Sequence, residues 1–277
     1  MPDTIAIVTG GLRGLGRAMT LGLLEQGHRV AAVGHIREDV EEMLTAAGAH
    51  SGRLLPLIAD LRTPAECDRV FAETRARFGR DAGILVNNAG LTFTFIDPAR
   101  FRRDKPFRFW EASDDIIQAV MDTNYVAADQ MARRAVPLML KAGWGRVVNV
   151  TTKLDTMNRA GSSPYGPSKA ALEMATEIWA KELVGTGVTV NIVNPGAGAN
   201  TPGMAVEMRA RSAAAAVPLL VEPDDMVPPL LFVVSREADQ VNGFRFDANN
   251  WHQGLDPKTM TRPAGFELYP VGGWTET

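Results

Sequence analysis

The sequence contains a single cysteine, Cys67, and only four histidines among its 277 residues. One cysteine excludes a disulfide within the chain and is typical of a reducing compartment. So few histidines and cysteines also argue against a structural zinc site, and we expect no metal. The N-terminus shows no basic segment followed by an apolar signal core, and no apolar run reaches the length of a membrane span. We therefore expect a cytoplasmic protein.

An excess of charge of either sign is also missing. The chain has 29 basic and 32 acidic residues, which gives a formal net charge of −3. This balance gives no reason to expect nucleic acid or an anionic membrane as a partner. We expect a partner among small molecules instead.

Short apolar runs alternate with helical patterns along the chain. The runs predict six strands, at residues 4–9, 29–33, 54–59, 84–86, 146–150 and 188–193. Helices are predicted at residues 17–26, 64–78, 114–141 and 165–184. This alternation predicts a parallel sheet that is covered on both faces. We expect an α/β Rossmann-type, doubly wound, three-layer fold, with a single domain at residues 1–251 and a C-terminal tail at residues 252–277.

A glycine-rich turn joins the first predicted strand to the first predicted helix. It reads Gly10-Gly11-Leu12-Arg13-Gly14-Leu15-Gly16. Glycines let the backbone approach a pyrophosphate closely, and the phosphate then lies at the positive end of the helix. Glycines also occur in ordinary turns. The flanking strand and helix favour the dinucleotide site.

The second predicted strand ends in Gly34-His35-Ile36-Arg37, without a carboxylate at its tip. Sites for NAD commonly have an acidic residue there, which binds the ribose 2′-OH. Arg13, His35 and Arg37 are instead candidates to bind a 2′-phosphate, because guanidinium groups bind phosphate bidentately. Arg37 is equally explained as a solvent-exposed residue at the start of the next helix. Arg13 is the better candidate, and the sequence favours NADP(H) over NAD(H).

Tyr165 and Lys169 are four residues apart, so both side chains lie on one face if this segment opens a helix. A free tyrosine has a pKa of about 10. A neighbouring ammonium group favours the phenolate and lowers that pKa toward neutrality. An isolated pair of this kind is more often a simple contact on a helix surface. The other motifs of the chain favour the catalytic interpretation.

Four motifs occur in a fixed order: Thr9-Gly10-x-x-x-Gly14-x-Gly16, Asn87-Asn88-Ala89-Gly90, Tyr165-x-x-x-Lys169 and Pro195-Gly196. With them the chain resembles a classical short-chain dehydrogenase/reductase over about residues 4–250. The resemblance implies an oxidoreductase that interconverts the carbonyl and alcohol forms of a small molecule. It also implies a homodimer or homotetramer, in which helices 114–141 and 165–184 pair across subunits.

The resemblance implies roles for single residues as well. Tyr165 would be the acid/base, Lys169 would lower its pKa and bind the nicotinamide ribose, and Asn124 would support a proton-relay water. The implied cofactor-binding positions, besides Tyr165 and Lys169, are Gly10, Leu12, Arg13, Gly14, Leu15, Gly16, Asp60, Leu61, Asn87, Ala89, Gly90, Pro195, Gly196 and Thr201.

The family usually has a serine thirteen residues before the tyrosine, and this chain has Thr152 there. Threonine keeps the hydroxyl donor, while its methyl group restricts χ1 and narrows the site. We expect Thr152 to replace the serine, with a restricted range of substrates. Ser163 is the competing hydroxyl.

A loop at about residues 91–111 is longer than the resemblance predicts, and it mixes aromatic residues with basic ones such as Arg102 and Arg103. It is either a substrate-binding loop for an acidic or aromatic substrate or a solvated loop whose aromatics pack on the fold or on a neighbouring subunit. The segment at residues 203–211 is a candidate lid, and its Met and Val residues are equally compatible with the core.

At the C-terminus, Asp247-Ala248-Asn249 stands where many relatives have Asp-Gly-Gly. The tail that follows is compatible with disorder, with a subunit contact or with a cover over the cleft. Two other functions stay open, namely an NAD-dependent alcohol dehydrogenase and a non-catalytic dinucleotide-binding scaffold.

Overall fold

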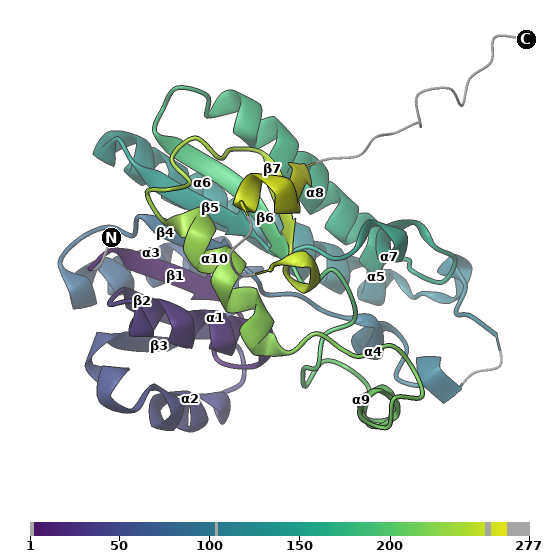
Figure 1. Cartoon of the computed structure of the whole chain (residues 1–277). Helices are drawn as coiled ribbons and strands as arrows, with labels where there is room; N and C mark the ends of the chain where they lie inside the picture. Colours follow the sequence, from purple (N-terminus) through teal and green to yellow (C-terminus); the bar gives the residue numbers. More distant parts are fainter. Residues whose placement is uncertain (1–2, 103–104, 253–255, 265–277) are drawn as a thin grey trace, which may run out of the picture.

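A computed structural model describes residues 3–102, 105–252 and 256–264. In this part of the chain, eight strands form one sheet in the order β3-β2-β1-β4-β5-β6-β7-β8 (Figure 1). Neighbouring strands pair in parallel, except for β7 and β8, which are antiparallel. The strands are β1 (Ile5–Thr9), β2 (Arg29–Gly34), β3 (Leu54–Ile58), β4 (Ile84–Asn87), β5 (Gly145–Asn149), β6 (Val188–Asn194), β7 (Phe244–Asp247) and β8 (Thr261–Pro263).

The strand order confirms the doubly wound topology. From β1 the chain runs outward to β3 and then returns to the other side of β1 at β4. The crevice between β1 and β4 is therefore the switch point, where ligands of such sheets bind beyond the carboxyl ends of the strands. The six strands expected from the sequence are all present, each within two residues of its expected bounds.

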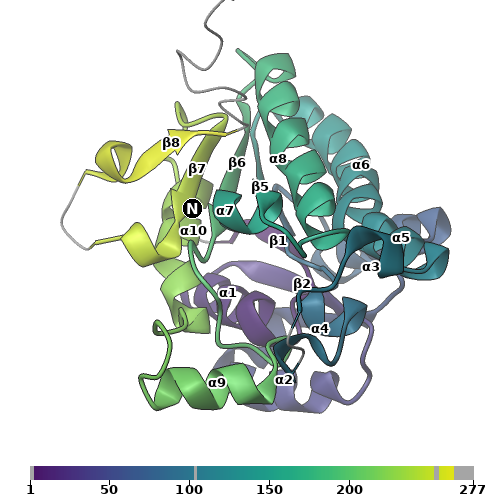
Figure 2. The same ribbon diagram turned by 90° about the vertical axis from the view of Figure 1, so that its right-hand side faces the viewer.

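Helices cover both faces of the sheet (Figures 1 and 2). They are α1 (Gly14–Glu25), α2 (Asp39–Ala47), α3 (Pro64–Phe78), α4 (Phe93–Ile96), α5 (Asp114–Met121), α6 (Ala127–Ala142), α7 (Leu154–Asn158), α8 (Tyr165–Glu182), α9 (Val206–Ala213) and α10 (Val227–Val234). Alternate residues of β1 enter two different cores: Ala6 and Val8 pack with α1, α2 and α10, whereas Ile5 and Ile7 pack with α3, α6 and α8. This period of two gives the three layers.

The helix expected at residues 114–141 is interrupted. Helix α5 ends at Met121, residues Asp122–Val126 form a π-helical turn, and α6 begins at Ala127. The sequence shows no break because all of these residues are compatible with an α-helix, so the uninterrupted helix was wrong in this respect. Short π-helical segments are frequent at functional sites.

The described residues contain neither a membrane-spanning helix nor a cluster of metal-ligating side chains. No helix among them has both the length and the apolar character needed to cross a bilayer. In the same residues, His, Cys, Asp and Glu side chains form no group of three or more that is arranged to hold a metal ion.

Candidate active site

The glycine loop between β1 and α1 has a backbone that larger residues would disrupt. Gly10 and Gly14 have φ values of 62° and 55°, in the left-handed region that favours glycine. A Cβ on Gly16 would lie 2.0 Å from the Gly10 carbonyl oxygen. Arg13, the N-cap residue of α1, makes no capping hydrogen bond through its side chain. The loop and the helix end therefore fit the pyrophosphate of a dinucleotide.

Hydrogen bonds fix this loop to the end of β4. The Thr9 hydroxyl accepts from the backbone N–H groups of Asn88 and Ala89, both at 3.0 Å. The Asn88 side chain donates to the carbonyls of Thr9 and Gly10, at 3.0 and 3.1 Å. The Asn87 side chain instead points into the protein and donates to Asn149 Oδ1 at 2.9 Å. Asn88, for which no role was predicted from the sequence, thus holds the loop in place.

Of the basic residues expected at a 2′-phosphate, His35 and Arg37 follow β2, and Arg13 lies in the glycine loop before α1. His35 and Arg37 are exposed. Arg13 is partly exposed, and its guanidinium lies 3.8 Å from the Asp39 carboxylate. A carboxylate therefore does stand near this end of the site, on α2 rather than at the strand tip.

Asp60 and Leu61, the pair expected beside the adenine, follow β3. Leu61 is buried. Asp60 forms an ion pair with Arg62 at 2.6 Å, and this hydrogen-bonded guanidinium lowers the pKa of Asp60. Asp60 is therefore anionic at neutral pH.

Lys169 is buried on the first turns of α8, and its ammonium donates to the Val150 carbonyl at 2.9 Å. Burial lowers the pKa of Lys169 to about 8. Burial raises the pKa of the half-buried Tyr165, and a hydrogen bond with the Thr152 side chain opposes that rise. The ammonium of Lys169 is directed at the Val150 carbonyl, at the carboxyl end of β5.

Asn124 lies in the π-helical turn and is fully buried. Its Nδ2 donates to Ser168 Oγ at 2.9 Å and to the Leu91 carbonyl at 3.1 Å, and its Oδ1 accepts from Leu91 N–H at 2.7 Å. A Cβ on Gly90 would lie 3.2 Å from Asn124 Oδ1 and 3.3 Å from Lys169 Nζ. The structure thus brings Gly90, Asn124 and Lys169 together.

Of the two candidate hydroxyls, that of Thr152 is the one bonded to Tyr165. Thr152 is buried, and its carbonyl accepts from Arg245 Nη2 at 2.6 Å. The side chain that stands in the position of the family's serine therefore faces the tyrosine. Its backbone is held from the opposite side by a residue of β7.

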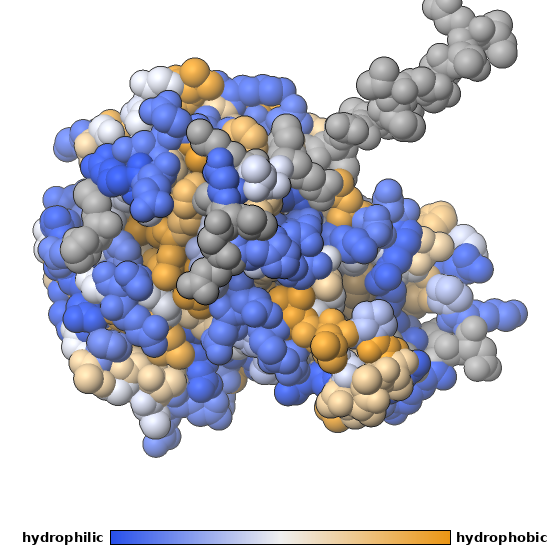
Figure 3. Space-filling view, in the orientation of Figure 1, coloured by the Kyte–Doolittle hydropathy of each residue, from blue (hydrophilic) through white to orange (hydrophobic). Residues whose placement is uncertain are grey.

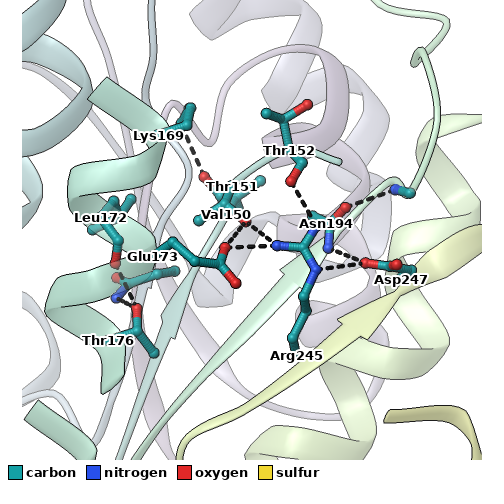
Figure 4. A network of polar contacts seen from close by, with 12 residues as sticks. Val150, Thr151, Thr152, Lys169, Leu172, Glu173, Thr176, Asn194, Arg245 and Asp247 are labelled. Carbon is teal, nitrogen blue, oxygen red and sulfur yellow. Dashed lines mark hydrogen bonds and ion pairs between the residues drawn. The ribbon is translucent and has the colours of Figure 1, made fainter. Parts of the chain in front are cut away.

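A buried ion pair lies beneath these residues (Figure 4). Arg245 on β7 and Glu173 on α8 are 2.6 Å apart, and both side chains are 0% exposed. The Thr151 hydroxyl donates to Glu173 at 2.9 Å and accepts from Arg245 at 3.2 Å. The pair therefore ties helix α8, which begins at Tyr165, to the loop that carries Thr152.

The same network reaches the Pro195-Gly196 loop. Arg245 also donates to Asp247, whose carboxylate accepts from the Asn194 side chain. Asn194 Oδ1 in turn accepts from the Gly196 N–H at 2.8 Å. A Cβ on Gly196 would lie 1.9 Å from Asn249 Oδ1, so Asn249 packs directly against this glycine. The departure at residues 247–249 thus contacts the Pro195-Gly196 loop.

Thr201 and the candidate lid lie near the glycine loop. A Cβ on Gly14 would lie 3.5 Å from Thr201 Cβ. The hydroxyls of Thr92 and Thr94 donate to the Gly203 carbonyl at 2.9 and 2.8 Å. Apolar surface lies beside α9 (Figure 3), where Val206 and Leu219 are 75% exposed.

Four aromatic residues of the long loop have different surroundings. The Phe93 ring packs against the Tyr165 ring with centroids 4.6 Å apart. Phe107 is buried with Ile96 and Val120 against the fold. Phe109 and Trp110 are exposed and pack edge to face. Phe107 thus packs on the fold, as the second interpretation of the loop expects, whereas the role of the loop in substrate binding stays a prediction.

The basic residues of the loop also differ in their contacts. Arg102 forms an ion pair with Glu207 of α9 at 3.0 Å. Arg100 contacts Phe93 instead. Arg103 and residues 265–277 of the expected tail lie outside the described residues.

The doubly wound sheet with a glycine loop at its switch point defines the class of dinucleotide-binding α/β proteins. A family model described as short chain dehydrogenase matches residues 4–212. The chain therefore belongs to the short-chain dehydrogenase family. It is an oxidoreductase that acts on CH–OH or C=O groups with NAD(P)(H).

Individual relatives agree with this assignment. A short-chain type dehydrogenase/reductase of Picea abies is 30% identical over 249 residues, which cover 86% of this chain and 88% of that protein. A 3-oxoacyl-(acyl-carrier-protein) reductase of Salmonella typhimurium is 31% identical over 192 residues, 69% of this chain and 72% of that protein.

Among solved structures, a 3-ketoacyl-(acyl-carrier-protein) reductase of Brucella melitensis complexed with NADH has a TM-score of 0.76 at 24% identity. The match covers 89% of this chain and 96% of that chain. An actinorhodin polyketide ketoreductase with NADPH has a TM-score of 0.74 at 24% identity, covering 87% and 95%. At this identity the two similarities establish the fold.

Proposed function

We propose that the protein catalyses NADP(H)-dependent interconversion of a carbonyl and an alcohol, with Tyr165 as the acid/base. The observation that carries the proposal is the hydrogen bond between Thr152 and Tyr165 beside the buried Lys169. Asn124 and Gly90 border the same ammonium. This arrangement gives a proton donor, a second hydroxyl and a nearby positive charge at the carboxyl ends of β4 and β5.

In the reductive direction, the Tyr165 hydroxyl gives its proton to the substrate oxygen, and the Thr152 hydroxyl donates a hydrogen bond to the same oxygen. A bound nicotinamide dinucleotide supplies the hydride. Protonated Lys169 stabilises the phenolate that remains on Tyr165. Asn124 supports the water that returns a proton to this site. Fixing these donors in advance lowers the cost of stabilising the developing alkoxide.

The residues proposed to hold the cofactor follow the edge of the sheet. The glycine loop at residues 10–16 takes the pyrophosphate, Asp60 and Leu61 border the adenine, and Ala89 and Gly90 line the path between them. Pro195, Gly196 and Thr201 border the nicotinamide. Arg13, His35 and Arg37 bind the 2′-phosphate, and NADP(H) is therefore the proposed cofactor.

One observation favours a second candidate, an NAD-dependent dehydrogenase. Asp39 lies 3.8 Å from Arg13 and offsets part of its positive charge. A carboxylate near the adenosine ribose is a feature of sites for NAD. The comparison of the two cofactors therefore decides between the two candidates.

The experiment is a titration of NADPH and NADH into the protein, followed by nicotinamide fluorescence, for the wild type and Arg13→Ala. We expect tighter binding of NADPH, and a loss of roughly tenfold in NADPH affinity in the variant. Arg17→Ala is the matched control, because Arg17 lies four residues further along, in the first turns of α1, and pairs with Glu42. Tighter binding of NADH would contradict the proposal, and binding of neither would favour a non-catalytic scaffold.

We also propose a homodimer or homotetramer that pairs through α5, α6 and α8. Apolar side chains on these helices are partly exposed, among them Ile117, Leu140 and Ile178. Burying such side chains between subunits would stabilise the assembly.

A further inference from the structure

Two guanidinium groups lie beside the ring that packs against Tyr165. The Arg100 guanidinium carbon is 4.0 Å from the Phe93 ring centroid, and that of Arg159 is 6.0 Å from the same centroid. Phe93 itself is 4.6 Å from Tyr165, centroid to centroid. The two cations therefore stand one ring away from the proposed acid/base.

The charges of this pair are incompletely balanced. Among the described residues neither guanidinium forms an ion pair, and Arg100 donates one N–H to the Gly161 carbonyl at 2.6 Å. Burial lowers the pKa of Arg100, the positive charge of Arg159 lowers it further, and Asp97 opposes both. Two cations held this close repel each other. An anion between them would remove that repulsion.

Arg102 shows the contrast. It lies two residues from Arg100, yet it is 71% exposed and paired with Glu207 at 3.0 Å. The sequence pointed to the basic character of the whole loop. In the structure, Glu207 neutralises the charge of Arg102, whereas Arg100 is directed at the proposed active site.

Both arginines belong to segments at the carboxyl ends of the strands. Arg100 follows α4, and Arg159 directly follows α7, which comes after Thr152. Helices α4 and α7 lie on the same side of the molecule, on the right of Figure 1. A substrate whose carbonyl reaches Tyr165 and Thr152 would therefore extend past Phe93 toward the two arginines.

We propose that Arg100 and Arg159 bind a carboxylate of the substrate, while Phe93 packs against an apolar part about one aromatic ring in length. The inference rests on the proposed function, because it takes Tyr165 to mark the reacting carbonyl. Planar guanidinium groups suit a carboxylate because they bind it with two parallel hydrogen bonds. The substrate class is thus an aldehyde or ketone that carries a carboxylate beyond an apolar spacer.

The first test compares reduction of 4-carboxybenzaldehyde and of its methyl ester with NADPH. We expect the wild type to prefer the carboxylate in kcat/KM by roughly tenfold, the size of one charge-assisted contact. Arg159→Gln should abolish the preference through KM and leave the ester unchanged. Arg102→Gln is the matched control and should keep the preference. Equal kcat/KM for acid and ester in the wild type would overturn the inference.

A second test needs no turnover. Benzoate is titrated by calorimetry into the wild type and Arg159→Gln, with benzamide and inorganic phosphate as the other ligands. We expect benzoate to bind the wild type at least tenfold more tightly than benzamide or phosphate, and to lose this advantage in the variant. Absence of benzoate binding contradicts the anion site, whereas phosphate binding more tightly than benzoate overturns the choice of a carboxylate.

The two tests separate the two levels of the proposal. If the ester is reduced as well as the acid, the proposed function holds and the anion site is wrong. If neither aldehyde is reduced but benzoate binds through Arg159, the anion site holds and the carbonyl chemistry is contradicted.

Discussion

Among single residues, Lys169 carries a charge that its surroundings disfavour. Burial lowers its pKa from 10.5 to about 8. The unfolded chain therefore binds one more proton than the folded chain between about pH 8 and 10.5. Below this window the folded state bears the full cost of a buried ammonium, and above it the cost is gone.

From this difference we expect wild-type stability to rise across that window relative to Lys169→Met, by up to about 3 kcal/mol. The measurement is urea unfolding of both proteins at several pH values from 7 to 10.5. Lys181→Met is the control, because Lys181 lies on the same helix but is 72% exposed. A constant difference between wild type and Lys169→Met at all pH values would mean that the pKa of Lys169 is not lowered.

Thr152 gives a second prediction at this scale. Thr152→Val removes the hydroxyl that bonds Tyr165 and keeps the shape of the side chain, so kcat should fall by about 10²–10³-fold. Thr152→Ser should retain most of the turnover, and Ser163→Ala should behave as the wild type. Steady-state kinetics decide the matter, and full turnover by Thr152→Val would remove Thr152 from the mechanism.

Single residues were predictable where they belong to short motifs. Tyr165, Lys169 and Asn124 could be named because their positions match a known pattern, and the structure brings Asn124 and Lys169 together around Gly90. Glu173 and Arg245 could not, since they are 72 positions apart and meet only when β7 pairs with β6. Phe93 could not be distinguished by sequence from the other aromatic residues of its loop, because its contact with Tyr165 depends on the fold.

At the scale of elements, the Glu173–Arg245 pair joins α8, β7 and the loop after β5. Removing one partner of a buried ion pair leaves an uncompensated charge, which costs about 3–5 kcal/mol, whereas replacing both with apolar residues is often neutral. The pair also holds the Thr152 carbonyl. Stability and turnover should therefore respond differently to removal of one partner and to replacement of both.

We expect Arg245→Met to destabilise the protein, and the double variant Glu173→Leu/Arg245→Met to recover most of that stability without recovering kcat. Thermal unfolding and steady-state kinetics provide the two measurements. Arg146→Met is the matched control, because Arg146 is equally buried but lies at the opposite end of β5, beside Asp239. If the double variant turned over as fast as the wild type, the pair would have no positioning role.

Helices and strands could be predicted from the sequence where they have a clear apolar pattern of their own. The six expected strands are buried runs, which periodicity detects. The π-helical turn at Asp122–Val126 has no comparable signal, because it depends on the packing of Asn124. Strand β8 has three residues and is defined by its pairing with β7, so no local sequence pattern predicts it.

For the whole molecule, the outer face of α8 bears on assembly. Ile178 on this helix is 47% exposed, which is unfavourable for a large apolar side chain in water. In the proposed homodimer or homotetramer this side chain is covered by another subunit.

Ile178→Asp should therefore shift the protein toward the monomer by placing a charge in an apolar contact. Sedimentation velocity of the wild type and the variant measures the change. Leu44→Asp is the control, because Leu44 is 39% exposed on α2, in the opposite layer. A wild type that sediments as a monomer would contradict the proposed assembly.

The two outermost strands of the sheet bear on solubility. Strand β3 contains Pro56, and β8 ends at Pro263 and is only three residues long. Proline has no N–H to offer to a further strand, and very short edges give an incoming chain little to pair with. Both edges of the sheet are therefore poor templates for the addition of a further strand. The carboxyl ends of the strands can therefore face ligands, while the two edges of the sheet disfavour aggregation by strand pairing between copies.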